Sequence, residues 1–285
     1  MSPHTEIPLR SSQTEHEVSF TSFDQWRAWL SAHPQMQSPD YIRELIAYVQ
    51  RHGAQSKYLG HISPEEVRVL DANYRESLLA RGFNPRLRAV LDLLADLPVS
   101  ADTWSTRIYA PEALTPFALL LAGRYARFVG SEYAHNDEQR RFLFPIRAED
   151  LLNLSFPSGV FDVVLSNEVF EHVPNLERSL AEVARVLKPG GTLLATFPFA
   201  YGLADTLVRA WFENGQLCYN GPPEYHGNPV DPAGGSLVFQ IPAWDVLDLC
   251  GEVGFSSVRM LFISSYRRGI TGAEIAGVHV LRAIR

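Results

Sequence analysis

The sequence predicts an α/β fold in which buried strands alternate with helices. The strongest indication lies at residues 161–197, where two short apolar runs flank a segment with helical periodicity. A second indication is that further strand and helix patterns follow one another between residues 107 and 283. Such alternation is typical of a mostly parallel sheet that is covered by helices.

The segment 161–199 is the most informative part of the chain. It reads FDVVLSNEVFEHVPNLERSLAEVARVLKPGGTLLATFPF. Residues 161–165 predict a buried strand, and polar residues follow at its carboxyl end, where open α/β sheets bind ligands. From Asn175 the apolar residues recur at helical spacing, until the Lys-Pro-Gly-Gly sequence ends the helix. Residues 192–197 then predict a second buried strand, so the segment is a strand–helix–strand crossover.

The sequence motif of this crossover, FDVV…EHV…RVLKPGG.LL…PF, resembles that of the class I S-adenosylmethionine (SAM) dependent methyltransferases, in their small-molecule "type 11"-like branch. The resemblance extends over residues 105–285. It implies a Rossmann-like, doubly wound sheet of seven mostly parallel strands with an antiparallel edge strand. It also implies SAM as the cofactor.

The order of the elements predicts a helical accessory cap at residues 1–103 and a Rossmann-like core at 104–285, with an insertion at about 200–242. In the cap we expect a loose tail (1–18), then helices that begin at Ser22, Pro39, Ser63 and Asn84, the third running to about Ala80. In the core we expect strands at 107–110, 127–131, 146–149, 257–264 and 277–283 besides the crossover. Helices are expected at 115–124 and 244–253.

The composition is that of an ordinary globular protein. Of 285 residues, 46% are hydrophobic and 20% charged, and the net charge is −7. An acidic chain has no electrostatic reason to bind nucleic acid or an anionic membrane, so neither partner is expected. No stretch approaches a membrane span of roughly 18 apolar residues, and no signal peptide is evident. We therefore expect a cytoplasmic protein, in which Cys218 and Cys250 are ordinary core thiols.

The resemblance implies a nucleoside pocket at the ends of successive core strands. Glu132 ends the second strand, where a carboxylate can accept hydrogen bonds from both ribose hydroxyls, and Tyr133 follows it. Asp150 stands at the spacing of the adenine-contacting acid in the family, and the Leu151 amide can donate to a ring nitrogen. The alternatives are a surface acid for Glu132 and a helix N-cap for Asp150. The other predicted cofactor residues, after the fourth strand, are Asn167 and Glu168.

The turn after the first core strand departs from the family. Counting back from Glu132 places the family's acid at Tyr109, which we include among the cofactor-binding candidates. The three glycine positions fall on Pro111, Ala113 and Thr115. The turn can still direct free N–H groups at a carboxylate, and Glu112 can replace the missing acid at the aminium group. The alternative for Glu112 is a solvated loop residue.

Arg75 and Arg86 are candidates to bind the methionine carboxylate of the cofactor, because the glycine-free turn lacks the usual partner for it. The alternative is that both are surface arginines on solvated helix faces. Aromatic residues of the insertion, Tyr225 among them, suit a small, flat or sugar-like acceptor.

Methyl transfer to a hydroxyl requires removal of its proton, and two histidines are candidate general bases. His172 stands in the Glu-His-Val segment, where resembling enzymes carry the same histidine, and His226 stands in the insertion. Structural roles are the alternative for both. The two histidines stand alone in the sequence, and no histidine–carboxylate group has metal-ligand spacing, so no metal is expected.

These observations predict an enzyme that moves a methyl group from SAM to a hydroxyl oxygen of a small metabolite or glycan precursor. One alternative, favoured by the glycine-free turn, is a binding module or pseudoenzyme with the same fold. Another is an enzyme that uses SAM without transferring its methyl group. The oligomeric state is left open by the sequence, and a homodimer is one option.

Overall fold

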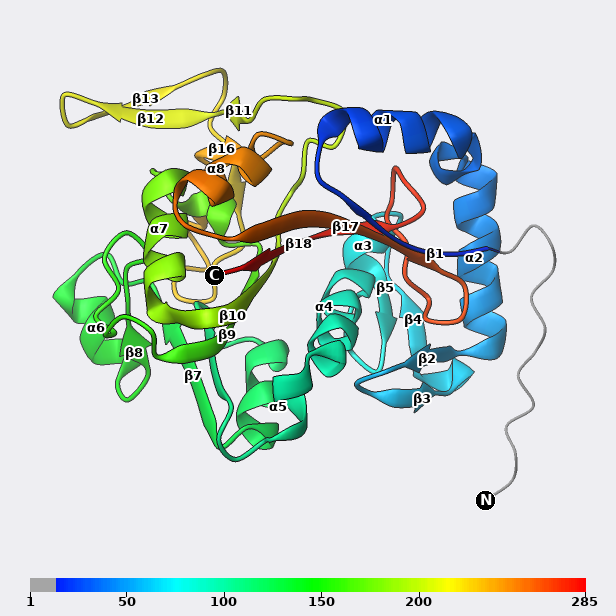
Figure 1. Cartoon of the computed structure of the whole chain (residues 1–285), viewed down its shortest axis with the longest axis horizontal. Coiled ribbons are helices and arrows are strands. Elements are labelled where there is room, and N and C mark those ends of the chain that lie inside the picture. The colour runs from blue at the N-terminus through cyan, green and yellow to red at the C-terminus, as the bar shows by residue number, and fades with distance from the viewer. Residues whose placement is uncertain (1–13) are drawn as a thin grey trace.

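The centre of the protein is one eight-stranded sheet, seen in a computed structural model that describes residues 14–285 (Figure 1). Its strands are β1 (Glu15–Phe20), β6 (Arg107–Ala110), β7 (Arg127–Glu132), β8 (Arg147–Ala148), β9 (Phe161–Asn167), β10 (Leu187–Thr196), β17 (Ser257–Ser265) and β18 (Val278–Ile284). Across the sheet they lie in the order β1-β17-β18-β10-β9-β6-β7-β8. The strand order therefore reverses between β6 and β9, which is the topological switch point at which such sheets bind ligands.

The strand directions confirm the predicted Rossmann-like, mostly parallel sheet. The five strands from β10 to β8 pair in parallel, whereas β18 is antiparallel to both β10 and β17. The sheet has an antiparallel edge strand, as predicted, but it has eight strands and not seven. The antiparallel β18 lies inside the sheet, and the edge is formed by the eighth strand, β1, antiparallel to β17. This strand comes from the predicted loose tail, of which residues 1–13 lie outside the described part of the chain.

Helices cover both faces of the sheet. The helices are α1 (Phe23–Ala32), α2 (Pro39–His52), α3 (Tyr74–Ser77), α4 (Pro85–Asp96), α5 (Pro116–Arg124), α6 (Asp137–Leu143), α7 (Leu176–Val186) and α8 (Val246–Glu252). Side chains of β9 alternate between two cores: Val163 and Leu165 pack with α4 and α5, while Val164 packs with α1, α7 and α8. None of the helices within residues 14–285 is long and apolar enough to cross a membrane.

The predicted crossover is confirmed as β9–α7–β10. The Asn175 side chain caps α7 by accepting a hydrogen bond from the Arg178 amide, so the helix begins where the periodicity changes. Gly190, inside β10, has a φ of +77°, a left-handed conformation that favours glycine, and the pairing of β10 with β9 shifts register between Leu187 and Thr192. β9 is buried except at Asp162, and β10 is buried from Gly191 to Thr196, as their apolar sequences require.

The N-terminal region is less helical than predicted. The capping box at Ser63 and Glu66 is present, but it opens only one 3₁₀ turn, η2 (Pro64–Glu66). The chain then forms β4 (Val67–Val69), α3 and β5 (Leu78–Ala80), so the predicted helix from 63 to 80 is wrong. A further hairpin pairs β2 (Ala54–Ser56) with β3 (Gly60–Ile62), and the remaining 3₁₀ turns before β6 are η1 (Pro34–Gln37) and η3 (Pro98–Ala101). Moreover, α4 packs on the sheet as part of the core, and the boundary near residue 103 stays a prediction.

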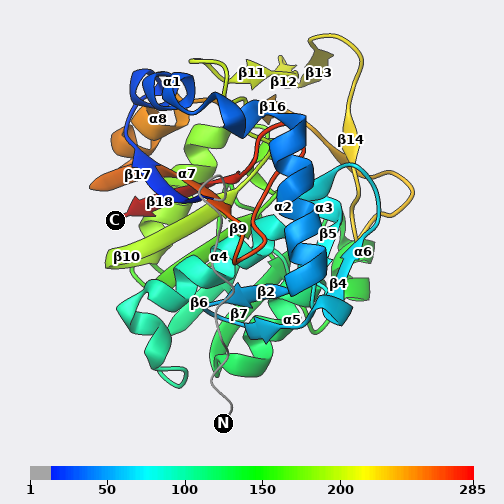
Figure 2. The same ribbon diagram turned by 90° about the vertical axis from the view of Figure 1, so that its right-hand side faces the viewer.

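The predicted insertion forms short hairpins. Its strands are β11 (Leu207–Val208), β12 (Ala210–Glu213), β13 (Gln216–Tyr219), β14 (Tyr225–His226), β15 (Ser236–Leu237) and β16 (Gln240–Ile241). The β12–β13 hairpin stands out from the rest of the chain in both views (Figures 1 and 2). The other end of the insertion is anchored on the 3₁₀ turn η4 (Phe170–His172), because the Phe239 amide donates to the Glu171 carbonyl at 2.8 Å. This anchoring brings β14 to the carboxyl end of β9.

Candidate active site

Buried charged residues gather at the carboxyl ends of the core strands. They come from the turn after β6, the end of β7, the turns after β9, and α4 beside the sheet: Arg86, Glu112, Glu132 and Glu171, each exposed by less than a tenth. Burying charge is costly unless the charge is paired, so such residues are concentrated where a site requires them. We therefore locate the candidate site at this edge of the sheet.

Glu112 belongs to a buried hydrogen-bond network. One carboxylate oxygen accepts from the Asn167 amide at 2.7 Å, and the other accepts from the Thr115 hydroxyl at 2.7 Å. The Thr196 hydroxyl donates to the Asn167 carbonyl oxygen at 3.2 Å. Burial raises the pKa of Glu112. Glu112 is therefore not a solvated loop residue: it connects the turn after β6 to the ends of β9 and β10.

Glu132 holds the glycine-free turn in place. Its Oε1 accepts hydrogen bonds from the Ala113 and Leu114 amides at 2.8 and 2.9 Å. The turn can approach this closely because β7 carries Gly130, where a Cβ would lie 3.0 Å from Glu112 O. The turn was expected to direct free N–H groups at a ligand, but its Ala113 and Leu114 amides donate to Glu132 instead. The second oxygen, Oε2, accepts no hydrogen bond from the described residues.

Arg75 and Glu168 form a two-pronged ion pair. The Arg75 Nη1 and Nη2 atoms donate to the two Glu168 oxygens at 2.9 and 2.7 Å, and Nη2 also donates to the Phe197 carbonyl. Burial raises the pKa of Glu168, but Arg86 and Arg75 outweigh it and hold that pKa well below its usual range. Glu168 has a φ of +54°, a strained conformation that is common at functional sites.

Arg86 is paired in the same way with Glu76. Its Nε and Nη2 donate to the two Glu76 oxygens at 3.0 and 2.7 Å, and Nε lies 3.5 Å from Glu168 Oε1. The alternative that both arginines are solvated surface residues is therefore wrong. Because both guanidiniums are already bound to carboxylates, their role toward a ligand carboxylate stays a prediction.

The predicted adenine side of the site is more open. The Asp150 carboxylate accepts from the Leu152 amide at 2.8 Å, as in a turn. Tyr133 is half exposed, and burial followed by the Asp150 charge raises its pKa, so the two residues are neighbours. Leu151 is buried, which leaves only its backbone for a ligand.

Tyr109 requires a correction. Its side chain is completely buried, its hydroxyl lies 2.9 Å from the Ser131 hydroxyl, and its ring stacks on Phe161. Tyr109 is thus a core residue of β6, and its side chain does not reach the edge where a cofactor would lie. Tyr109 does lie in the strand before the glycine-free turn, but its side chain points into the core.

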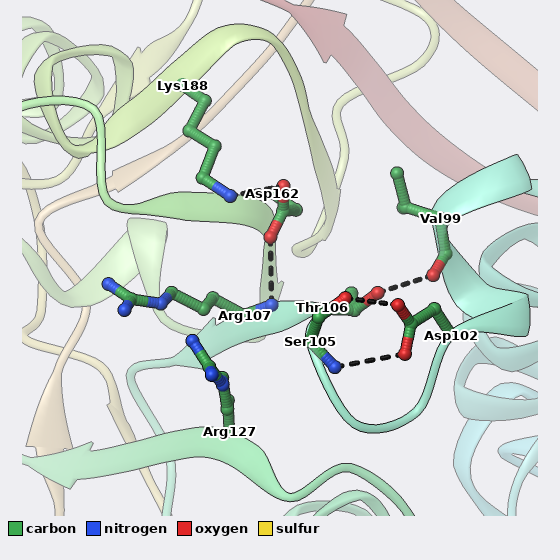
Figure 3. A pocket seen from close by; sticks show the side chains of 8 residues that line it. All are labelled: Val99, Asp102, Ser105, Thr106, Arg107, Arg127, Asp162 and Lys188. Carbon is green, nitrogen blue, oxygen red and sulfur yellow. Dashed lines mark hydrogen bonds and ion pairs between the residues drawn. The ribbon is translucent and has the colours of Figure 1, made fainter.

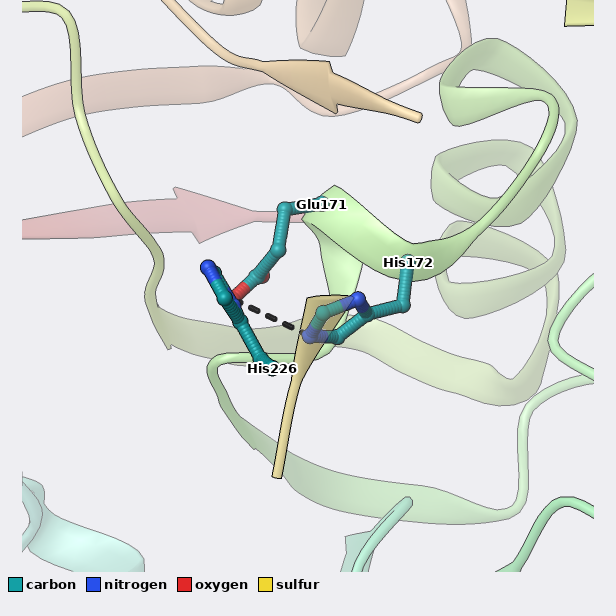
Figure 4. A group of neighbouring side chains, drawn as sticks. All are labelled: Glu171, His172 and His226. Atoms are coloured by element: carbon teal, nitrogen blue, oxygen red, sulfur yellow. Dashed lines mark ion pairs between the residues drawn. The ribbon is translucent and has the colours of Figure 1, made fainter. Parts of the chain in front are cut away.

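Glu171, His172 and His226 come together in the structure (Figure 4). Glu171 Oε1 lies 3.6 Å from His172 Nε2 and 3.7 Å from His226 Nδ1. The statement that the two histidines stand alone is therefore wrong for the folded protein. Burial raises the pKa of Glu171 and lowers that of His172, while the neighbouring Glu171 carboxylate raises that of His226.

Tyr225 precedes His226 on β14 and is half exposed. Neighbouring residues of a strand point to opposite faces, so Tyr225 does not share the face on which His226 meets Glu171. Its role toward an acceptor stays a prediction.

A pocket at the opposite end of the sheet is a different kind of feature (Figure 3). It lies at the amino ends of β6, β7 and β9. There Asp162 accepts from Lys188 Nζ at 2.6 Å and from the Arg107 amide at 2.9 Å. These contacts join neighbouring strands, and ligands of such sheets bind at the other end. Asp162 is therefore structural.

Several residues of the site are not among those predicted from the sequence. Glu76, which neutralises Arg86, directly follows Arg75, and Glu171 directly precedes His172. Their positions next to the predicted site residues Arg75 and His172 were the signal in the sequence that could have identified Glu76 and Glu171. Glu224, whose Oε1 lies 3.3 Å from His226 Nε2, had the same signal at a spacing of two, which suits a strand.

The charges of the site indicate what it can bind. Among the described residues, Arg75 and Arg86 form ion pairs with Glu76 and Glu168, whereas Glu112 and Glu132 accept hydrogen bonds from uncharged groups. The excess of carboxylates favours a ligand that carries positive charge. Next to them, the cluster of Glu171 and two histidines offers groups that can accept a proton or bind a metal ion.

Comparison with known protein families places this geometry in context. Residues 118–195, from α5 to the end of β10, match the family of methyltransferase domains. The matched segment begins after the glycine-free turn. It contains the end of β7, with Glu132, and the turns after β9, with Glu168 and Glu171.

Curated relatives match over short segments. A sterol 24-C-methyltransferase of Neurospora crassa is 49% identical over 65 residues, 23% of this chain and 15% of that protein. A phthiotriol/phenolphthiotriol dimycocerosates methyltransferase of Mycobacterium tuberculosis is 44% identical over 62 residues, 22% of each chain. The chain thus spans less than a quarter of the length of these relatives. A solved S-adenosylmethionine dependent methyltransferase from Mesorhizobium loti is 18% identical, with a TM-score of 0.44, over 70% of this chain and 96% of that one.

Proposed function

Because the chain carries a class I methyltransferase domain, we propose that it transfers the methyl group of SAM to a small-molecule acceptor. The observation that carries this proposal is the set of buried carboxylates at the topological switch point of the sheet. Bound SAM supplies an electrophilic methyl group on a positively charged sulfur. The excess of carboxylates over guanidiniums at this edge suits such a cationic ligand.

We assign the nucleoside of SAM to the open half of the site. Glu132 keeps Oε2 for a ribose hydroxyl while Oε1 fixes the turn, so this carboxylate can serve both partners at once. Asp150 and the half-exposed Tyr133 flank the place of the adenine. Glu112 faces the methionine half, where its buried carboxylate attracts an aminium group.

For the acceptor atom we propose a hydroxyl oxygen of a small metabolite or glycan precursor. A hydroxyl acceptor loses a proton during the transfer, and the cluster of Glu171, His172 and His226 lies directly after β9, at the same edge as Asn167. His226 is the most exposed member, with a third of its side chain accessible, so an acceptor can reach it. Relatives that methylate sterols at C-24 make a carbon acceptor the main alternative.

One observation favours a second candidate, a binding module without transferase activity. The Ala113 and Leu114 amides of the glycine-free turn donate to Glu132, so they are not free to bind the cofactor carboxylate. A turn that is occupied in this way binds the methionine half more weakly than a glycine-rich loop.

Product analysis separates these functions. The protein is incubated with SAM and a panel of phenols, sugars, sterols and amines, and S-adenosylhomocysteine and the methylated product are measured by mass spectrometry. We expect S-adenosylhomocysteine together with an O-methylated product. Transfer only to carbon or nitrogen would contradict the hydroxyl assignment. Binding of SAM without turnover across the panel would favour the binding module.

A further inference from the structure

The cluster of Glu171, His172 and His226 contains a carboxylate that the fold leaves unsatisfied. The Glu171 side chain is completely buried, and neither of its oxygens has a hydrogen-bond partner among residues 14–285. The nearest nitrogens, at 3.6 and 3.7 Å, are too distant for hydrogen bonds. A buried carboxylate without partners costs several kcal/mol, so its retention requires a reason.

The distances fit a missing ion between the three groups. Two ligand atoms that bind one metal at roughly 2.0–2.1 Å in tetrahedral geometry are about 3.3 Å apart. The observed separations from Glu171 Oε1 exceed this value by only a few tenths of an ångström, and all three ligand atoms lie within 4.8 Å of one another. Small side-chain adjustments would bring them to bonding positions.

In each histidine, the ring nitrogen that points away from Glu171 has a hydrogen-bond partner, so the nitrogen that points toward Glu171 is free to bind a metal ion. His172 Nδ1 lies 2.9 Å from the Leu237 carbonyl, which can only accept, so Nδ1 carries the hydrogen and Nε2 keeps its lone pair toward Glu171. His226 Nε2 lies 3.3 Å from a Glu224 oxygen, which likewise leaves Nδ1 with its lone pair. A carbonyl or carboxylate behind each ligating histidine is the usual support of a metal site.

The backbone fixes this arrangement. Glu171 and His172 lie in η4. His226 lies in β14, which pairs with β15 so that His226 stands opposite Ser236. The insertion is tied to η4 by the Phe239 amide on the Glu171 carbonyl and by the Gln240 side chain on the Phe170 and Val173 carbonyls. Strand pairing and hydrogen bonds between the insertion and η4 thus hold the three side chains near one another.

We propose that Glu171, His172 and His226 bind one divalent transition-metal ion of the zinc, manganese, cobalt or iron(II) class. Two imidazoles and one carboxylate are typical ligands for these metals, whereas magnesium and calcium sites are built from oxygen. Three protein ligands leave at least one coordination position for a further oxygen. Resting on the proposed function, we assign that position to the acceptor hydroxyl: an ion bound there would ease release of the hydroxyl proton to solvent water, and the oxygen would then bond to the methyl group as the methyl–sulfur bond of SAM breaks. His226 then acts as a ligand, and no free histidine base is required.

The test is metal binding by the full chain. Protein stripped with EDTA is titrated with ZnSO₄, MnCl₂ or CoCl₂ by calorimetry, and bound metal is counted by mass spectrometry after desalting. We expect one ion per chain for at least one of these metals. Glu171→Gln and His226→Ala should each weaken binding at least tenfold, and Glu224→Gln by roughly ten- to hundredfold. The control His52→Ala, in α2 away from the cluster, should bind like the wild type.

Binding that is absent, or that is unchanged in both Glu171→Gln and His226→Ala, would overturn the proposal. His226 is partly exposed, so its variant remains informative if Glu171→Gln does not fold, which circular dichroism would reveal. Titration with SAM of the same stripped preparation keeps the two proposals apart. Metal binding without SAM binding would support the metal site and contradict the proposed function. SAM binding without metal binding would contradict the metal site and leave the proposed function in place.

Discussion

The two ends of the central sheet both carry charged side chains, but the burial and the pairing of these side chains differ between the two ends. At the amino ends, Asp162, Lys188 and Arg107 surround an open pocket, and Asp162 is satisfied by a lysine that is 40% exposed (Figure 3). At the carboxyl ends, Glu112 and Glu171 are withdrawn from water, and Glu171 lacks a hydrogen-bond partner in the described part of the chain (Figure 4). The more open end is therefore the structural one.

The comparison shows that a site is recognised by the cost of its charges more than by its opening. Exposed ion pairs such as that of Asp162 and Lys188 contribute about 0–1 kcal/mol and cost little to form. Buried pairs such as that of Arg86 and Glu76 bring little net stability, yet breaking them is expensive. Four substitutions sharpen this contrast, in order of decreasing expected effect.

Arg86→Ala should destabilise the protein by about 3 kcal/mol, near the lower end for a broken buried pair, because Glu76 stays one-third exposed. The free energy of unfolding in urea measures this. The control is Arg43→Ala, which breaks an exposed ion pair with Asp40 on α2 and should cost less than about 1 kcal/mol. Equal losses in the two variants would contradict the distinction between buried and exposed pairs.

Glu132→Ala should weaken SAM binding at least tenfold, because a charge-assisted hydrogen bond contributes about 1.5–3 kcal/mol. Glu132→Gln keeps an oxygen for the Ala113 and Leu114 amides, so it separates the ligand contact from the support of the turn. Calorimetric titration provides the affinities. If both variants bind SAM as the wild type does, Glu132 is not the ribose acid.

His279→Phe should remove part of the acid sensitivity of the fold. His279 lies in β18 beside Trp26 and Phe199, and burial lowers its pKa to about 3. The unfolded chain binds a proton below the ordinary pKa of about 6.5, whereas the native state does not, so stability falls as the pH drops from about 6.5 toward 3. The slope from this group is at most about 1.4 kcal/mol per pH unit. Unfolding curves of the variant and the wild type that stay parallel from pH 7 to pH 4 would contradict this.

Asp162→Asn should have the smallest effect, with a loss of about 1 kcal/mol or less in stability and no change in SAM affinity. The partially exposed pair with Lys188 is lost, but the remaining oxygen still accepts from the Arg107 amide. Thermal unfolding and the SAM titration measure the two quantities. A clear loss of SAM affinity would show that the amino ends of the strands take part in binding.

The sequence predicted the elements whose signals are local. The β9–α7–β10 crossover and the α4 start at Asn84 follow from apolar spacing and capping, which act within a few residues. The helix expected from Ser63 failed because the capping box is also local. Val67 and Val69 then pair with Ala80 and Leu78, a contact between distant residues that outweighs the helix start signal.

The site was predictable in position and only partly in its contacts. Placing Glu112, Glu132 and Asn167 at the carboxyl ends required only the strand order, which the crossover implies. That Glu132 binds the turn, or that His226 meets Glu171, depends on how the turn and the insertion fold back on the sheet. No short-range pattern encodes such contacts between distant parts of the chain.

Calorimetric titration of the full chain with SAM tests the central claim most directly, namely that the charged carboxyl edge of the sheet is a SAM site. We expect one binding site per chain, lost or weakened at least tenfold in Glu132→Ala and unchanged in Asp162→Asn. Absence of binding to well-folded protein, or equal binding by the two variants, would contradict the assignment of this edge.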